Sequence, residues 1–273
     1  MRNEANELNY YLLPASLLQK GHMEWRLFSN LYSQTRSFDA AGRKINLSLR
    51  ASYFTEIVQW SYGITSRFNV GVDMLYKAVS LDAPGSTPLA IFHSGDNERA
   101  QAGLSGIGPK IRWIPFRRLP RLSIQSTLYF PVKKDMEGRV SGKPFLEYDR
   151  IFLWTQINMD RMLHPKWQVY GGVDLWFRSD YSFDPQRFLL STPLKMILSW
   201  FPDEKSAFYF LTEWTPTFGE PLMSSYYLQS GLGFKYFILE QLEGELLFTS
   251  FFLGKNSGAG KTFNLGLRYI LQR

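Results

Sequence analysis

Apolar and polar residues alternate with a period of two along most of the chain. In the last such segment Phe263, Leu265, Leu267, Tyr269 and Leu271 share one face, and mostly polar or small residues stand between them. A strand places successive side chains on opposite faces, whereas a helix would scatter both sets. The pattern therefore predicts strands with one apolar face and one mixed face.

The same alternation recurs in about twelve segments, most of them ten or more residues long. They are 23–36, 44–63, 67–79, 104–116, 122–132, 149–162, 167–179, 189–201, 206–217, 225–238, 242–253 and 262–271. This length exceeds that of most strands in soluble proteins and suits tilted membrane strands. The second segment slips between Tyr53 and Val58, which predicts a bulge or a tall strand that leaves the bilayer. We therefore predict an all-β, transmembrane, up-and-down antiparallel barrel of about twelve strands over residues 23–273.

The connections between these segments fall into two alternating sets. The short set is 64–66, 117–121, 163–166, 202–205 and 239–241, and the longer set is 37–43, 81–103, 133–148, 180–188, 218–224 and 254–261. Outer-membrane barrels have short periplasmic turns and longer extracellular loops. An even number of strands then leaves both termini in the periplasm. Residues 1–22 lie outside the pattern and are predicted to form an N-terminal periplasmic or plug segment.

Tryptophan positions test this assignment independently. Five tryptophans fall on the apolar face at the short-turn end of their strands: Trp25, Trp60, Trp113, Trp167 and Trp200. Membrane barrels carry girdles of aromatic residues where lipid meets water, whereas a soluble core has no reason to collect them at strand ends. We expect these five residues to form the periplasmic girdle, and Trp214 to belong to a second one.

Composition excludes several classes of protein. Hydrophobic residues make up 45% and aromatic residues 16%, yet the mean hydropathy is −0.21 and polar residues interrupt every apolar stretch. A helical membrane protein would need runs of roughly 18 apolar residues. The chain has no cysteine, so it can form neither disulfides nor thiolate metal sites. Its net charge of +7 is scattered, and we expect no binding of nucleic acid. The first residues do not form a signal peptide, so we expect an exported protein whose signal has been removed.

Three short motifs resemble a known group of barrels. Tyr62–Val72 (YGITSRFNVGV) resembles a hairpin of bacterial outer-membrane transporter-like barrels, including the group linked to phenol meta-pathway degradation. Gly103–Arg112 and Leu128–Val132 are similar to two further strands of that group. The chain departs from it at Pro109, where an acidic residue is expected nearby, and at its non-aromatic end. The resemblance implies a twelve-stranded pore or channel for small molecules, hydrophobic ones among them.

Charged residues of both signs are predicted to point into the barrel. The expected lumen-lining residues are Arg26, Asp73, Lys110, Arg112, Asp160, Asp174, Arg178, Lys195, Glu213, Lys235, Glu245 and Arg268. Buried charges are tolerated only when paired or hydrated, and a strongly ion-selective pore would show one sign. We expect either a charge-paired, nearly closed interior or a narrow polar channel. Six aromatic residues also point inward, as a slide for apolar molecules or as filling: Tyr129, Trp154, Tyr170, Trp176, Tyr209 and Tyr227.

Candidate catalytic and cofactor sites are weak. Gly254–Thr262 ends like a phosphate-binding loop, but its spacing is one residue too long and a strand is predicted to follow. His22, His93 and His164 are predicted to lie too far apart to share a metal. The polar run His93–Glu98 is interpreted as a solvated loop. We therefore predict no enzyme activity, no metal and no cofactor.

Two functions remain open from the sequence. The leading one is an outer-membrane channel or transporter-like barrel that passes or binds a small molecule. The alternative is an accessory barrel within a larger outer-membrane assembly or secretion complex, with Pro88–Phe92 and Pro221–Met223 as candidate contacts. The expected partners are outer-membrane lipid and lipopolysaccharide, with other envelope proteins as further candidates. An open lumen favours the first function.

Overall fold

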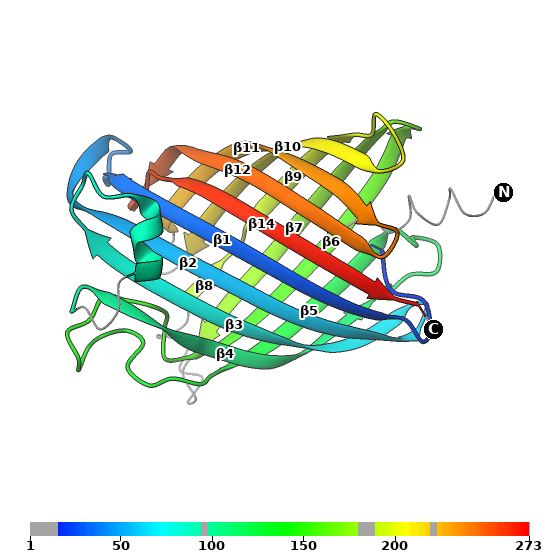
Figure 1. The fold of residues 1–273 in the computed structure, drawn as a ribbon, viewed down its shortest axis with the longest axis horizontal. Helices are drawn as coiled ribbons and strands as arrows, with labels where there is room; N and C mark the ends of the chain where they lie inside the picture. Colours follow the sequence, from blue (N-terminus) through cyan, green and yellow to red (C-terminus); the bar gives the residue numbers. More distant parts are fainter. Residues whose placement is uncertain (1–15, 94–97, 180–188, 219–222, 273) are drawn as a thin grey trace.

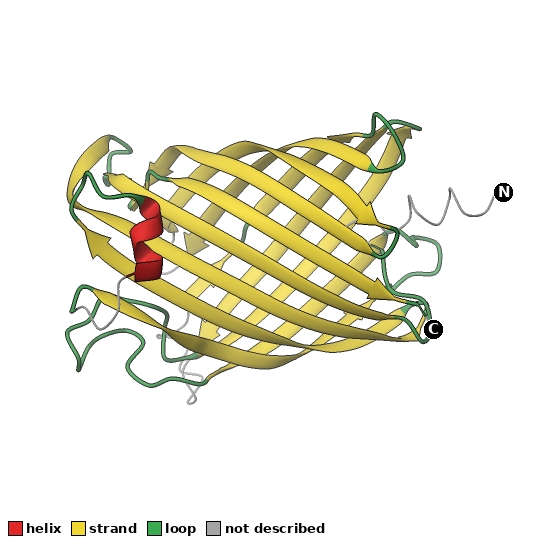
Figure 2. Ribbon diagram, in the orientation of Figure 1, coloured by secondary structure: helices red, strands yellow, loops and turns green. Residues whose placement is uncertain are grey.

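The structure is a computed structural model, and it describes residues 16–93, 98–179, 189–218 and 223–272. Its strands are β1 (Met23–Phe38), β2 (Lys44–Thr65), β3 (Phe68–Asp82), β4 (Ala100–Trp113), β5 (Leu122–Pro131), β6 (Ile151–His164), β7 (Trp167–Ser179), β8 (Leu189–Ser191), β9 (Leu194–Trp200), β10 (Ser206–Phe218), β11 (Met223–Leu239), β12 (Leu242–Lys255), β13 (Ser257–Gly258) and β14 (Lys261–Leu271). One short 3-10 helix, η1 (Pro88–His93), lies outside the barrel (Figure 2). Among the described residues, no helix is long and apolar enough to cross a membrane.

The strands close into an antiparallel barrel of 12 wall strands (Figure 1). Each wall strand pairs with the next wall strand along the chain, and β14 closes the ring against β1. The short β13 pairs with β1. The predicted fold class is therefore confirmed. The predicted strand 189–201 is broken into β8 and β9 at Thr192 and Pro193, because proline has no N–H to donate. Both pieces pair with β7 and β10, so together they make one wall strand.

The irregular second segment is a tall strand and has no bulge between Tyr53 and Val58. β2 is 22 residues long and pairs with β3 without interruption from Arg50 to Gly63. The register shifts of β2 lie elsewhere: against β1, residues 47–50 of β2 face the single residue between Gln34 and Arg36, and against β3 a shift lies between Gly63 and Thr65. The alternation slips because Ile57 points inward and packs in an interior apolar cluster, while Glu56 occupies an outward position. Of the two alternatives predicted for this segment, a bulge or a tall strand, the structure has the tall strand.

The outer surface is apolar and the inner surface is polar. Along β14, Phe263, Leu265 and Leu267 are exposed, while Asn264 and Arg268 on the alternate positions are buried. A soluble protein rarely exposes so continuous an apolar surface. A bilayer is the solvent that accommodates it, because only the outward residues of a membrane barrel meet lipid.

The two ends of the barrel differ in their connections. β1 starts and β14 ends at the same end of the barrel (Figure 1). The connections at that end are 66–67, 114–121, 165–166, 201–205 and 240–241, close to the predicted short set. The two longest connections, 83–99 and 132–150, join strands at the opposite end, although 39–43 there is no longer than 201–205. The helix η1 lies at that end against the outer face of β1, β2 and β3.

Candidate functional site: the barrel lumen

The lumen contains a cavity of about 850 Å³ that is lined by side chains from strands all round the wall. Eight of the predicted lumen-lining residues border it: Arg26, Arg112, Arg178, Lys195, Glu213, Lys235, Glu245 and Arg268. The other four, Asp73, Lys110, Asp160 and Asp174, are buried against the inner wall behind other side chains. All six predicted inward aromatic residues border the cavity as well.

Interior charges are balanced and paired among the described residues. The cations are Arg26, Lys77, Lys110, Arg112, Arg178, Lys195, Lys235 and Arg268, and the anions are Glu24, Asp73, Glu147, Asp160, Asp174, Glu213, Glu243 and Glu245. Each lies within 4.0 Å of an opposite charge, although the partner of Asp160 is Arg121 in a turn. A lumen of this kind has no excess sign with which to select an ion.

A compact ion cluster lies at the end where β1 begins. Glu24 is 2% exposed and contacts three guanidinium groups, with Arg26 at 3.2 Å, Arg112 at 3.4 Å and Arg268 at 2.5 Å. Arg268 also contacts Glu243 at 3.7 Å. The cluster ties strands from distant parts of the chain to one buried carboxylate. It is the kind of site in which losing one partner leaves other charges buried and uncompensated.

Residues before β1 dock against this cluster. Leu17 and Leu18 are fully buried, and the Arg112 Nη2 atom donates to the Ser16 carbonyl oxygen at 2.9 Å. A Cβ atom at Gly63 would lie 2.1 Å from the Gln19 carbonyl oxygen, so the close approach of this segment requires glycine there. Residues 16–22 of the predicted N-terminal segment therefore line one end of the barrel interior, and residues 1–15 lie outside the described residues.

A second buried pair links four neighbouring strands. The Lys110 ammonium lies 2.6 Å from Asp73 Oδ1. The other oxygen, Oδ2, accepts from Gln59 at 3.0 Å, from Thr127 at 3.0 Å and from the Tyr129 hydroxyl at 3.2 Å. The carboxylate is therefore held by an ion pair on one oxygen and by three hydrogen bonds on the other, which offsets the cost of burying its charge.

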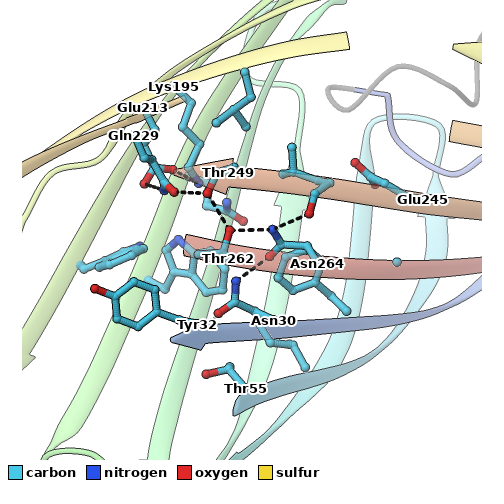
Figure 3. A pocket seen from close by; sticks show the side chains of 18 of the residues that line it. Asn30, Tyr32, Thr55, Lys195, Glu213, Gln229, Glu245, Thr249, Thr262 and Asn264 are labelled. Carbon is cyan, nitrogen blue, oxygen red and sulfur yellow. Dashed lines mark hydrogen bonds and ion pairs between the residues drawn. The ribbon is translucent and has the colours of Figure 1, made fainter. Parts of the chain in front are cut away.

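A chain of hydrogen bonds crosses one wall of the cavity, and we call its six residues the polar belt (Figure 3). The bonds are Asn30 Nδ2 to Asn264 Oδ1 (2.6 Å), Asn264 Nδ2 to Thr262 Oγ1 (3.1 Å), Thr262 Oγ1 to Thr249 Oγ1 (2.6 Å), Thr249 Oγ1 to Gln229 Oε1 (2.6 Å) and Gln229 Nε2 to Glu213 Oε1 (2.8 Å). Because Thr249 donates its one hydroxyl hydrogen to Gln229, Thr262 must donate to Thr249. All five bonds then donate in the same direction, and the chain ends on a carboxylate. Such chains polarise and strengthen their members. The belt spans β1, β14, β12, β11 and β10.

The wall across from the belt is aromatic, and Phe28 of β1 packs against its cluster. We call these five residues the aromatic wall: Phe28, Tyr129, Phe152, Trp154 and Trp176. The rings of Tyr129 and Phe152 are stacked with centroids 5.5 Å apart, and Phe152 and Trp154 follow at 6.5 Å. Trp176 stands edge-on to Trp154 at 6.2 Å. Four of these residues come from β5, β6 and β7, which lie across the ring of strands from β12 and β14.

The connection 132–150 folds into the mouth opposite the chain ends. Met136 and Leu146 are buried there against Val79 of β3. Burial alone would raise the pKa of Glu147, but Lys77 and then Arg178 more than offset it and hold that pKa at about 2. Sequence reasoning missed Glu147, because nothing in the local pattern shows that this connection enters the lumen.

The five predicted girdle tryptophans lie on the outer face near the end with short connections. Trp25 is 51% exposed and pairs in register with Trp60. Trp113 pairs with the exposed Phe68, and the rings of Trp167 and Trp200 lie 6.5 Å apart on adjacent strands. These side chains form an outward aromatic band.

The remaining sequence candidates are spread over several elements, and Thr262 at the end of one of them belongs to the polar belt. Gly254–Thr262 spans the end of β12, β13 and the start of β14, so a strand follows it as predicted. Pro88–Phe92 forms most of η1, in which Ile91 is buried while Leu89 and Phe92 are each 54% exposed. Most of Pro221–Met223 and of His93–Glu98 lies outside the described residues. Within the described part of the chain, no group of three or more His, Cys, Asp or Glu side chains could hold a metal ion.

Comparisons with known proteins identify the fold. No family model and no curated protein sequence matches the chain. Among solved structures, an outer-membrane channel from Pseudomonas putida F1 is similar over 94% of this chain and 98% of its own, with a TM-score of 0.69 and 11% identity. The β-domain of the Bordetella autotransporter BrkA is similar over 92% of this chain and 99% of its own, with a TM-score of 0.57 and 11% identity. The fold is that of a bacterial outer-membrane β-barrel.

Proposed function

We propose that this protein is a passive channel of the bacterial outer membrane through which a small molecule crosses or in which it binds. One observation carries the proposal: the closed barrel holds a cavity of about 850 Å³ rather than a packed core. Small-molecule sites in proteins commonly have volumes of about 300–1,000 Å³. The similarity to an outer-membrane channel supports the same reading.

The charge balance of the lumen defines what kind of channel this is. Channels that select ions strongly line their pores with one sign of charge. Here each interior charge has an opposite partner, so we propose weak ion selectivity. We propose no catalytic step, because the described carboxylates of the lumen are held by cations.

The orientation follows from the two sets of connections. We propose that the end with short connections, where β1 begins and β14 ends, faces the periplasm. An epitope tag placed after Arg273 would then be hidden from antibody on intact cells. The same tag inserted at Gly42, in the connection between β1 and β2, would be accessible. The opposite labelling pattern would contradict this orientation.

Conductance of the purified barrel in planar bilayers tests the function. We expect steady, ohmic single-channel currents with a permeability ratio for K⁺ and Cl⁻ near one. Gln229→Trp places a large side chain in the cavity and should lower the conductance. Ser230→Trp is the matched control, because the next residue faces outward and should leave the conductance unchanged.

A silent barrel would contradict the proposal. If the protein conducts nothing and co-purifies from mild detergent with stoichiometric envelope proteins, the accessory role in a larger assembly becomes the better explanation. The exposed Leu89 and Phe92 of η1 are then the first residues to replace in a co-purification experiment.

A further inference from the structure

The two walls of the cavity have complementary chemistry. In the aromatic wall, Trp154 and Trp176 are partly exposed beside the buried rings of Tyr129 and Phe152. The polar belt presents amide and hydroxyl groups across the ring of strands from them. We infer that the lumen binds an uncharged molecule that carries a ring and several hydroxyl groups, of the size of an aryl glycoside or smaller. This inference rests on the proposed channel function and names its class of guest.

The aromatic wall provides the apolar half of the site. Tyr129, Phe152 and Trp154 form a nearly parallel column, and Trp176 stands at 88° to Trp154. Parallel and perpendicular rings side by side make a corner that a flat guest ring can contact by stacking and by its edge. Phe28, Ile57 and Leu75 extend the apolar surface to the neighbouring strands.

The polar belt provides the hydrogen-bonding half of the site. The bond from Asn30 to Asn264 uses the amide nitrogen of Asn30, so its side-chain oxygen can accept from a guest hydroxyl. At the other end of the belt, the Glu213 carboxylate collects bonds from Gln229, Thr215 and Tyr227. A hydroxyl group can both donate and accept, and it therefore suits a belt that offers both kinds of group.

The paired charges argue against a charged guest. Arg26, Arg112 and Arg268 share Glu24, and Lys195 lies between Asp174 and Glu213. A carboxylate or ammonium on the guest would have to take a partner away from one of these groups or remain unpaired in the lumen. Either outcome costs binding energy that an uncharged guest does not lose.

Three related probes test the class of guest. They are 4-hydroxyphenyl β-D-glucoside, methyl β-D-glucoside, which lacks the aromatic ring, and 4-hydroxyphenyl β-D-glucuronide, which carries a carboxylate. Binding is measured by calorimetry on the barrel in detergent and by block of the ion current in planar bilayers. We expect the aryl glucoside to bind about tenfold more tightly than either other probe, since one ring contact or one unpaired charge is worth about that factor. Equal affinity for the glucuronide and the glucoside would overturn the inference.

Variants of Trp176 test the aromatic wall. The indole Nε1 atom of Trp176 is buried and has no hydrogen-bond partner among the described residues, so Trp176→Phe removes the nitrogen without breaking a bond. This variant should keep the preference for the aryl glucoside. Trp176→Leu keeps an apolar side chain but removes the ring, and it should lower the affinity severalfold. An unchanged affinity in Trp176→Leu would contradict a role for this ring.

Asn30→Leu tests the polar belt, with Leu31→Met on the outward face as its control. The first variant should weaken binding of both glucosides, and the control should weaken neither. The two measurements separate this inference from the proposed function. A barrel that conducts ions but binds none of the probes refutes the inference and keeps the channel. A barrel that binds the aryl glucoside without conducting refutes the channel and keeps the site.

Discussion

The outer and inner faces of the same strands follow different rules. On the outer face of β14, Leu265 and Leu267 lie next to each other. A bilayer requires only that such side chains be apolar. On the inner face, Asn264 bonds to Asn30 and Thr262, and Arg268 bonds to Glu24. The outer face is therefore specified by composition. The inner face is specified by particular partners, many of which are distant in the sequence.

This difference predicts how each face tolerates change. An outer residue has many acceptable apolar replacements, since lipid adapts to its shape. An inner residue has few acceptable replacements, because its removal leaves a buried partner without its hydrogen bond or ion pair. Substitutions on the two faces should therefore differ in their cost to the free energy of unfolding.

Glu24→Gln should be among the most damaging single changes. It removes the negative charge shared by Arg26, Arg112 and Arg268, and breaking a buried ion pair costs about 3–5 kcal/mol. The free energy of unfolding in urea, measured in lipid or detergent, should fall by about that amount. The double variant Glu24→Gln with Arg112→Leu should recover part of the loss, because it removes one of the stranded charges. Full additivity of the two changes would show that the cluster does not act as a unit.

Leu265→Arg, on the outer face, should lower the free energy of unfolding by somewhat less than Glu24→Gln does. The residue lies in the middle of β14 and is 38% exposed on the lipid-facing side. Placing arginine near the middle of a bilayer costs about 2–4 kcal/mol in membrane barrels. Leu265→Met is the control and should cost less than about 1.5 kcal/mol. An equally mild effect of both changes in lipid would mean that this face does not meet the bilayer core.

The sequence predicts the outer face well because alternation is a local property. β14 shows five apolar residues at every second position, and the predicted segment 262–271 differs from the strand by one residue at its start and ends at the same residue. The five girdle tryptophans follow the same logic, since strand ends and face parity can both be read locally. Proline at position 193 was visible, but the local pattern did not show that it divides one wall strand into β8 and β9.

The inner face could be predicted only as a list of residues. Alternation places Arg268 in the lumen, but its partner Glu24 lies 244 positions away in the chain. Only the closure of β14 on β1 brings the two together. Glu147 was missed entirely, because it reaches Lys77 and Arg178 from a connection and no periodic pattern marks it. Long-range pairing of this kind depends on closure of the barrel and is absent from any local window.

Glu147 provides a test by pH at the lumen mouth. Its pKa is held at about 2, below the ordinary value of 4.5, so its contribution to stability is complete above about pH 4.5 and is lost as the pH falls toward 2. Glu147→Gln should imitate the acid state at neutral pH. It leaves Lys77 and Arg178 without their shared carboxylate and should shift the reversal potential in a KCl gradient toward anion selectivity. Glu137→Gln, in the same connection, is the control and should leave the selectivity unchanged. If Glu147→Gln and the unchanged protein have the same reversal potential at pH 7, then this carboxylate does not offset the positive charge of Lys77 and Arg178 at the mouth.

Replacing Glu56 should change the free energy of unfolding least. It tests most directly whether outer residues need only be apolar. Glu56 occupies an outward position of β2 between Phe54 and Val58, and it pairs in register with Ser29 and Tyr76. If this face meets only lipid, a carboxylate there is unfavourable, though less so than arginine. Glu56→Leu should then raise the free energy of unfolding by about 1 kcal/mol in lipid vesicles. Thr55→Val, one position away on the inner face, should not stabilise the protein. A loss of stability in Glu56→Leu would show that the outer face is specified by a partner at this position, as the inner face is throughout.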